Sequence, residues 1–142
     1  MKKIHSVSVT AFVIFLLCSC GGAPDQGGTP TTSGASATIS GEAVYKRTCI
    51  TCHQANGEGL PNTYPPLAKS DFLADKEKEI KQVISGFTGE LVVNGTKYNS
   101  SMPAQQLNDD EIAAVLTYVN SNFGNTGGAV TAGEVKSVRA KL

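Results

Sequence analysis

The chain has 142 residues, the length of one domain, and its 12 basic and 12 acidic residues give a formal net charge of zero. A protein that binds nucleic acid needs a concentration of Lys and Arg, and this composition offers none. We therefore expect one small domain that does not take nucleic acid as a partner.

The first 19 residues have the pattern of a secretion signal. Two lysines precede an apolar run over residues 7–17, which is too short for a permanent membrane-spanning helix. The run ends in Leu-Cys-Ser-Cys, which resembles a bacterial lipobox with Cys20 as the lipidated residue. We expect residues 1–19 to be removed and Cys20 to anchor the mature protein to a membrane. The alternative is ordinary cleavage near Ala23 and release into solution.

Residues 20–38 are rich in Gly, Pro, Ser and Thr. They include no aromatic side chain and no aliphatic one larger than Ala, so this segment cannot bury apolar area. We expect a flexible linker that joins the lipidated Cys20 to a folded domain over residues 39–142.

A short helix is expected over residues 41–49, and it leads into the pentapeptide Cys-Ile-Thr-Cys-His at residues 49–53. In an exported protein this spacing is typical of covalent haem attachment, because each thiol can bond a vinyl group while the imidazole binds the iron. We predict that Cys49 and Cys52 hold one haem c and that His53 is an axial iron ligand.

A loop and a second helix follow the pentapeptide. Gly, Pro and Asn occur at turn density over residues 54–66, which predicts the loop. From Asp75 onward, apolar residues recur at i, i+3, i+4 and i+7 as far as Phe87, in a charged background. This periodicity predicts an amphipathic helix that Gly86 and Gly89 bring to an end.

A tight hairpin is predicted next. Residues 91–93 and 96–98 flank the pair Asn94-Gly95, which tolerates the positive φ values of a type I′ turn. Residues 99–103 then have the composition of a turn and are expected to form a loop.

The clearest helix begins at Asn108, whose side chain and that of Glu111 form a capping box before apolar residues repeat at helical spacing up to Asn122. After several glycines, Thr131 and Glu134 give the same signature for a short final helix. We expect this helix to pack back on the domain, with docking to a partner as the alternative. Helix should therefore dominate the domain.

Only one Met remains once residues 1–19 are removed, because Met1 leaves with the signal. It is Met102, which lies 49 residues after His53 in the loop before the last long helix. A neutral thioether favours ferrous iron relative to a second imidazole and so raises the reduction potential. We expect Met102 to be the second axial ligand; the alternative is a buried Met that fills a gap in the core.

Three alternatives to haem attachment exist for the two cysteines. A thioredoxin-like dithiol would need a strand before the motif and a parallel sheet after it, whereas a helix is expected before it. A structural zinc site needs four ligands, and the domain offers only Cys49, Cys52 and His53. A plain disulfide would leave His53 without a role.

Residues 41–123 resemble a small monohaem class I c-type cytochrome. The resemblance rests on the pentapeptide, on the stretch from Gly57 through Tyr64-Pro65-Pro66-Leu67, on Tyr98 with Met102-Pro103, and on the helix from Leu107 to Val119. Most closely, the chain resembles the haem subunits and fused haem domains that accompany bacterial respiratory oxidases, nitrite reductases and membrane dehydrogenases. The resemblance implies a mainly α, class I cytochrome c fold, with helices around one covalent haem and a small hairpin before the axial Met loop.

The resemblance also implies which residues surround the haem. The Pro65 carbonyl, or alternatively that of Pro66, is expected to accept a hydrogen bond from His53 Nδ1, which fixes the orientation of the ring. Leu67 is expected to pack on a haem face. Tyr98 is a candidate for a hydrogen bond to a haem propionate, with ordinary packing as an equal alternative.

The resemblance extends to one helix crossing. Tyr45 is expected to meet the last long helix near Tyr118, where the two helices cross at Gly41. One residue departs from the family pattern, since Gln54 follows the motif His where many relatives have Gly.

These expectations together describe an electron carrier and not an enzyme. One electron would pass through the haem within a respiratory electron-transport chain, between redox proteins that dock at the haem edge. No small-molecule substrate is expected, because both axial positions are filled. The alternatives are a permanent haem subunit of an oxidase, reductase or dehydrogenase complex, and a haem peroxidase or gas-binding protein with an open iron site. Export followed by haem attachment places the protein on the periplasmic side of a membrane, most simply in a Gram-negative bacterium.

Overall fold

The computed structural model describes residues 38–142. The predicted signal, Cys20 and all but the end of the predicted linker therefore lie outside the described residues. Among residues 38–142, no helix is both long and apolar enough to span a bilayer.

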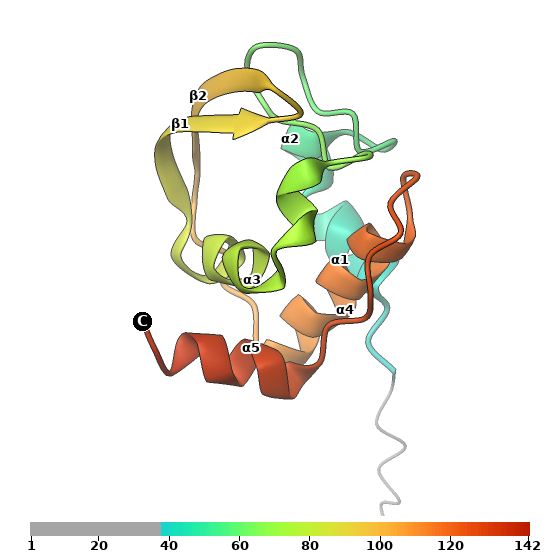
Figure 1. The fold of residues 1–142 in the computed structure, drawn as a ribbon. Helices are drawn as coiled ribbons and strands as arrows, with labels where there is room; N and C mark the ends of the chain where they lie inside the picture. Colours follow the sequence, from blue (N-terminus) through green and yellow to red (C-terminus); the bar gives the residue numbers. More distant parts are fainter. Residues whose placement is uncertain (1–37) are drawn as a thin grey trace, which may run out of the picture. The chain divides into compact units, whose positions relative to one another are not determined.

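The described part of the chain is mostly helical and contains one antiparallel pair of strands (Figure 1). The elements in chain order are α1 (Gly41–Thr48), α2 (Ile50–His53), a 3₁₀ turn η1 (Asp71–Ala74), α3 (Lys76–Ser85), β1 (Phe87–Val93), β2 (Thr96–Met102), α4 (Asp109–Ser121) and α5 (Ala132–Arg139). The expectation of a mainly α fold with one small hairpin is therefore confirmed.

Helices α1 and α4 pack directly against each other, and Gly41 makes the close approach possible. A Cβ atom at Gly41 would collide with the Ala114 carbonyl oxygen and would lie 2.7 Å from Tyr118 Cβ. One turn later, Tyr45 is 2% exposed, and its ring centroid lies 5.6 Å from that of Tyr118. The predicted meeting of Tyr45 with Tyr118 at the Gly41 crossing is confirmed.

Helix α3 ends earlier than its apolar periodicity suggested. Gly86 caps the helix with φ 71°, and its amide donates to the Gln82 carbonyl. This left-handed residue turns the chain, so that Phe87 belongs to β1 and not to the helix. The predicted end of the helix at Gly86 is confirmed, but the prediction that Phe87 belongs to the helical face was wrong, because a glycine with positive φ overrides the spacing of the apolar residues.

The hairpin forms where it was predicted but is longer at both strands. Asn94 and Gly95 have φ values of 51° and 75°, as a type I′ turn requires. Pairing then runs from Val93 opposite Thr96 to Phe87 opposite Met102. The expected loop over residues 99–103 is therefore mostly strand, since the ladder of backbone hydrogen bonds holds even this polar stretch extended.

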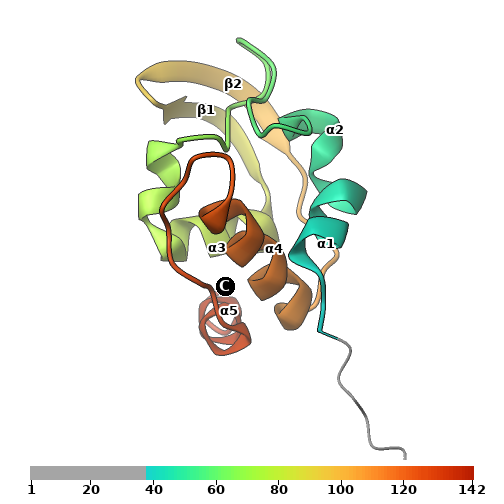
Figure 2. The same cartoon turned by 90° about the vertical axis from the view of Figure 1, so that its right-hand side faces the viewer.

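The last two helices have the predicted caps. Asn108 and Glu111 form a capping box before α4, and Thr131 and Glu134 form another before α5. Helix α5 packs on α3 and α4, where Val135 is fully buried and Lys76 bonds to Glu134 at 3.0 Å. The prediction that the final helix packs back on the domain is confirmed. Figures 1 and 2 both place α5 and the hairpin at opposite ends of the domain.

Candidate functional site

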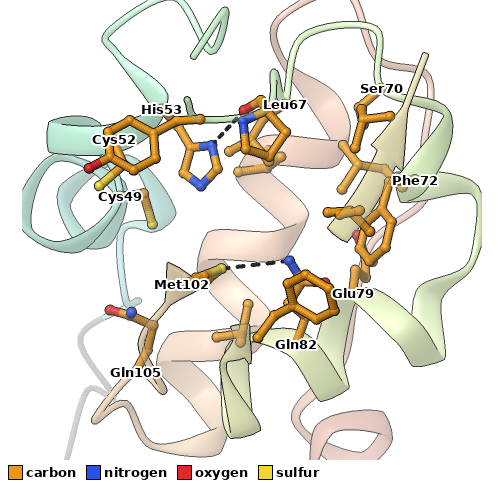
Figure 3. A pocket seen from close by; sticks show the side chains of 18 of the residues that line it. Cys49, Cys52, His53, Leu67, Ser70, Phe72, Glu79, Gln82, Met102 and Gln105 are labelled. Atoms are coloured by element: carbon orange, nitrogen blue, oxygen red, sulfur yellow. Dashed lines mark hydrogen bonds between the residues drawn. The ribbon is translucent and has the colours of Figure 1, made fainter. Parts of the chain in front are cut away.

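An apolar cavity lies between α2, the loop after it, η1, α3, the hairpin and α4. Figure 3 shows the side chains that project into it. Its walls are largely aliphatic and aromatic, and they include Leu67, Phe72, Leu73, Val83, Phe87 and Leu116. The sulfur and imidazole groups singled out by the sequence also open into this cavity.

Cys49 and Cys52 reach the cavity from the junction of α1 and α2. Cys49 caps α1, and its carbonyl accepts the amides of both Cys52, at 3.2 Å, and His53, at 3.0 Å. This tight turn places both half-buried thiols on the cavity wall, where they are free and not joined to each other. Burial raises the pKa of the Cys49 thiol, an effect that a contact with the Thr48 hydroxyl opposes.

His53 is held in one orientation by the loop that follows it. Its Nδ1 lies 3.0 Å from the Pro65 carbonyl oxygen, which can only accept a hydrogen bond, so Nδ1 carries the proton. Burial lowers the pKa of His53, against the opposing effect of this bond, so the ring is neutral near pH 7. Nε2 then keeps its lone pair, and Figure 3 shows this side of the ring facing Met102 across the cavity.

Met102 enters the cavity from the end of β2. The strand pairing opposite Phe87 fixes its backbone, and just beyond it the Gln105 amide donates to the Val83 carbonyl at 2.9 Å. The half-buried thioether thus projects from a backbone anchored on both sides. Pro103, directly after it, ends the strand.

Two polar residues of the cavity were not predicted from the sequence. Gln82 points its amide at Met102, with Nε2 3.8 Å from Sδ, and Glu79 lies one turn earlier on the same helix at 2% exposure. Both share the inner face of α3 with Val83, since residues 79, 82 and 83 are three and four positions apart. That spacing was the available signal, but a charged background concealed it.

The remaining expected site residues divide into two groups. Pro65, Pro66 and Leu67 line the cavity, and the His53 contact falls on Pro65. Tyr98 is buried at 8% exposure within the hairpin, opposite Leu91 on the neighbouring strand, and is not one of the residues that line the cavity. Its position therefore matches the packing alternative.

Neither a thioredoxin-like dithiol nor a zinc site has a matching architecture within residues 38–142. The sheet has two antiparallel strands, whereas a thioredoxin-like dithiol needs parallel ones. Within the same residues, no three His, Cys, Asp or Glu side chains are grouped to hold a metal ion by themselves. Two thiols, an imidazole with a free lone pair and a thioether opening into one apolar cavity fit a covalently bound haem.

Comparison with known proteins agrees with this geometry. The family model described as "Cytochrome c" matches residues 39–123. Cytochrome c-552 of Thermus thermophilus is 39% identical in an alignment of 116 positions that covers 74% of this chain and 78% of that protein. The fructose dehydrogenase cytochrome subunit of Gluconobacter japonicus is 34% identical, over 72% of this chain but 22% of that protein. The gluconate 2-dehydrogenase cytochrome c subunit of Pantoea cypripedii is 31% identical, over 70% of this chain and 24% of that protein.

The matched region, residues 39–123, contains the two thiols, the imidazole and the thioether that open into the cavity. It ends before α5, which is therefore an addition to the part that the family model covers. The chain belongs to the cytochrome c family and is a monohaem c-type cytochrome, an electron carrier with one covalently bound haem c.

Proposed function

We propose that Cys49 and Cys52 form the two thioether bonds to the haem and that His53 and Met102 bind its iron from opposite sides. The observation that carries this proposal is the approach of a neutral imidazole and a thioether from two sides of one apolar cavity. The helices then surround the cofactor as in a class I cytochrome c. When bound, the haem supplies the redox change, its iron alternating between ferric and ferrous states.

The protein's own residues set the conditions for that change. Pro65 holds the His53 ring in place, so that little reorganisation accompanies electron transfer. Leu67 and the other apolar side chains of the cavity exclude water, which disfavours the charged ferric state and raises the potential together with the Met102 ligand. Ligation of the iron by both His53 and Met102 would leave it no site for a substrate.

Carbon monoxide tests the ligand assignment because it needs an open position on ferrous iron. We expect slow and weak binding to the wild type and rapid binding to Met102→Ala, in which the position is vacated. A conservative control is Met102→His, which keeps a ligand and should also bind carbon monoxide slowly. Rapid binding to the wild type would instead favour a peroxidase or gas-binding protein and would refute the assignment.

We also propose that the protein works as a mobile carrier within a respiratory chain. Two similar proteins are named as cytochrome subunits of fructose and gluconate dehydrogenases, yet this chain matches less than a quarter of either. The cytochrome c-552 relative, by contrast, is matched over most of its length. Haem-stained native electrophoresis of gently solubilised membranes distinguishes the two roles: a carrier migrates alone, and a permanent subunit migrates with an oxidase, reductase or dehydrogenase.

The location proposed for this carrier is the periplasmic face of a membrane. Residues 1–19 would act as a lipoprotein signal, Cys20 would receive the lipid, and residues 20–38 would link the anchor to the domain over residues 39–142. Metabolic labelling with radioactive palmitate should mark the wild type, and Cys20→Ser should lose the label. Labelling that persists in Cys20→Ser, while Cys18→Ser abolishes it, would assign the anchor to the other cysteine.

A further inference from the structure

The cavity contains one carboxyl group, Glu79, that neither haem attachment nor iron ligation uses. Its side chain lies on the α3 wall beside Gln82, and the residue is 2% exposed (Figure 3). Oε1 accepts a hydrogen bond of 2.9 Å from Asn120 Nδ2 on α4, but Oε2 has no partner among residues 38–142. Within the same residues, the Oδ1 atom of Asn120 is likewise buried without a partner. A fully ionised carboxylate is poorly compensated at such a position.

The charges around Glu79 do not compensate it either. Lys76, one turn earlier, directs its ammonium to the Ala129 carbonyl and to Glu134 on α5, at 2.9 and 3.0 Å. Asp75 and Glu134 are themselves acidic and oppose the ionisation of Glu79. Burial is the largest effect, and together with these charges it raises the pKa of Glu79 to about 7, although the Asn120 bond and Lys76 act in the opposite direction.

Among residues 38–142, the elements packed near Glu79 place no second carboxylate, ammonium or guanidinium group in the cavity wall. On η1, Asp71 accepts the Asn94 amide at 2.8 Å and is exposed. The titratable side chains that line the cavity besides Glu79 are Tyr64 and the three residues of the haem motif, which attachment and ligation occupy. The propionates of the haem would be the remaining acids, and they belong to the cofactor and not to the chain.

We propose that Glu79 is a redox-linked proton site, which takes up one proton when the haem is reduced and releases it when the haem is oxidised. The proposal rests on the function proposed above. Reduction brings one electron from the donor protein and removes one positive charge from the cavity. The carboxylate of Glu79 loses that favourable neighbour, so its affinity for a proton from water rises. Oxidation passes the electron to the acceptor and returns the proton to water.

The consequence is a reduction potential that depends on pH. The potential should fall as pH rises between the pKa of Glu79 in the oxidised protein and its higher value in the reduced protein. A tenfold difference in proton affinity between the two oxidation states corresponds to a total change of about 59 mV for one electron. The change should be centred near pH 7, where the pKa of Glu79 lies.

Spectroelectrochemical titration of the holoprotein at pH values on both sides of 7 tests the proposal. We expect Glu79→Gln, which keeps the shape of the side chain and can still form a hydrogen bond with Asn120, to abolish the pH dependence of the potential near pH 7. The matched control is Glu77→Gln on the same helix, at an exposed residue paired with Lys141. This variant should retain the pH dependence. Asn120→Ala removes the bond that lowers the pKa of Glu79, so the dependence should move to higher pH.

Infrared difference spectra on reduction provide a second readout, which does not depend on the potential. Reduction near pH 7 should produce a carboxylic acid carbonyl band that shifts in heavy water and is absent from Glu79→Gln. A potential independent of pH in the wild type, or one whose dependence persists unchanged in Glu79→Gln, would overturn the proposal and, in the second case, assign the proton to the propionates. Neither result would change the assignment of His53 and Met102 as iron ligands, because the carbon monoxide experiment tests that assignment separately.

Discussion

The Tyr45 hydroxyl donates a hydrogen bond of 2.7 Å to the carbonyl oxygen of Gln54, the residue directly after the motif His. This contact fixes the chain as it leaves α2, and Gln54 there has φ 63° and ψ 165°. Such backbone angles are almost restricted to glycine. The departure from the family pattern at this position therefore coincides with a strained backbone.

Gln54→Gly should stabilise the protein. Relief of a backbone strain of roughly 1–3 kcal/mol should outweigh the entropic cost of ordering glycine, which is more flexible than glutamine in the unfolded chain. We therefore expect the free energy of unfolding to rise by about 1 kcal/mol. Guanidinium unfolding of the holoprotein measures it. Gln54→Ala is the control, because it loses the same exposed bond to Thr51 but keeps a Cβ atom. Equal stability of the Gly and Ala variants would show that no strain is stored there.

The helix crossing gives a second prediction. Gly41→Ala should destabilise the protein by about 1–3 kcal/mol, because its Cβ has no room between α1 and the backbone of α4 at Ala114. Gly133→Ala near the start of α5 is the matched control, since a Cβ there would come no closer than 3.9 Å to Thr131 Oγ1. It should be neutral or stabilising by roughly 0.5–1 kcal/mol. Thermal unfolding of the two variants compares them, and similar losses in both would contradict a steric role for Gly41.

The sequence predicted those features that depend on local chemistry. The capping box at Asn108, the Asn94-Gly95 turn and the attachment pentapeptide all act within a few residues, and the structure has each helix or turn in place. The two candidate iron ligands were predicted because His and Met each occur once outside the predicted signal. Met102 was the only Met outside the predicted signal.

The predictions from sequence failed where the structure depends on contacts between residues that are distant in the chain. Strand pairing with Phe87 extended β2 to Met102, although residues 99–101 are polar and gave no strand signal. Glu79 belonged to the charged background of its predicted helix, since a charged residue among lysines is usually exposed. Its burial depends on α4, which supplies Asn120 from 41 residues away. No local pattern contains that information.

Gln82 offers a third prediction, concerning the reduction potential. Its amide points at the Met102 sulfur, and such a donor would withdraw electron density from the proposed thioether ligand of ferric iron. Gln82→Leu should therefore lower the reduction potential by roughly 20–60 mV, which corresponds for one electron to the net free energy of one hydrogen bond. Gln105→Leu is the control, because Gln105 also lines the cavity but bonds to the Pro103 carbonyl. An unchanged potential in Gln82→Leu would show that the amide does not act on the sulfur.

Stability should also depend on pH through Glu79. Its pKa is raised from 4.5 to about 7 by folding, so between these values the folded state binds a proton that the unfolded chain has lost. The free energy of unfolding must then fall as pH rises through this window, by up to about 3 kcal/mol. Glu134, whose pKa is lowered to about 2, contributes only at much lower pH.

Guanidinium unfolding of the oxidised protein near pH 5 and near pH 8 measures this dependence. The decline should vanish in Glu79→Gln and persist in the exposed Glu77→Gln. Stability that rises over the same window in the wild type would mean that Glu79 is ionised without penalty in the folded state.

Axial ligation by Met102 is tested most directly by the environment of its methyl group in the ferrous holoprotein. With ¹³C-methyl methionine incorporated, a mature protein without the proposed signal of residues 1–19 should give one methyl signal, because Met102 is the only Met beyond that segment. We predict that the haem ring current displaces this signal far to low frequency, as expected for a thioether on the iron opposite His53. A methyl signal at the ordinary position for a buried methionine would contradict axial ligation by Met102.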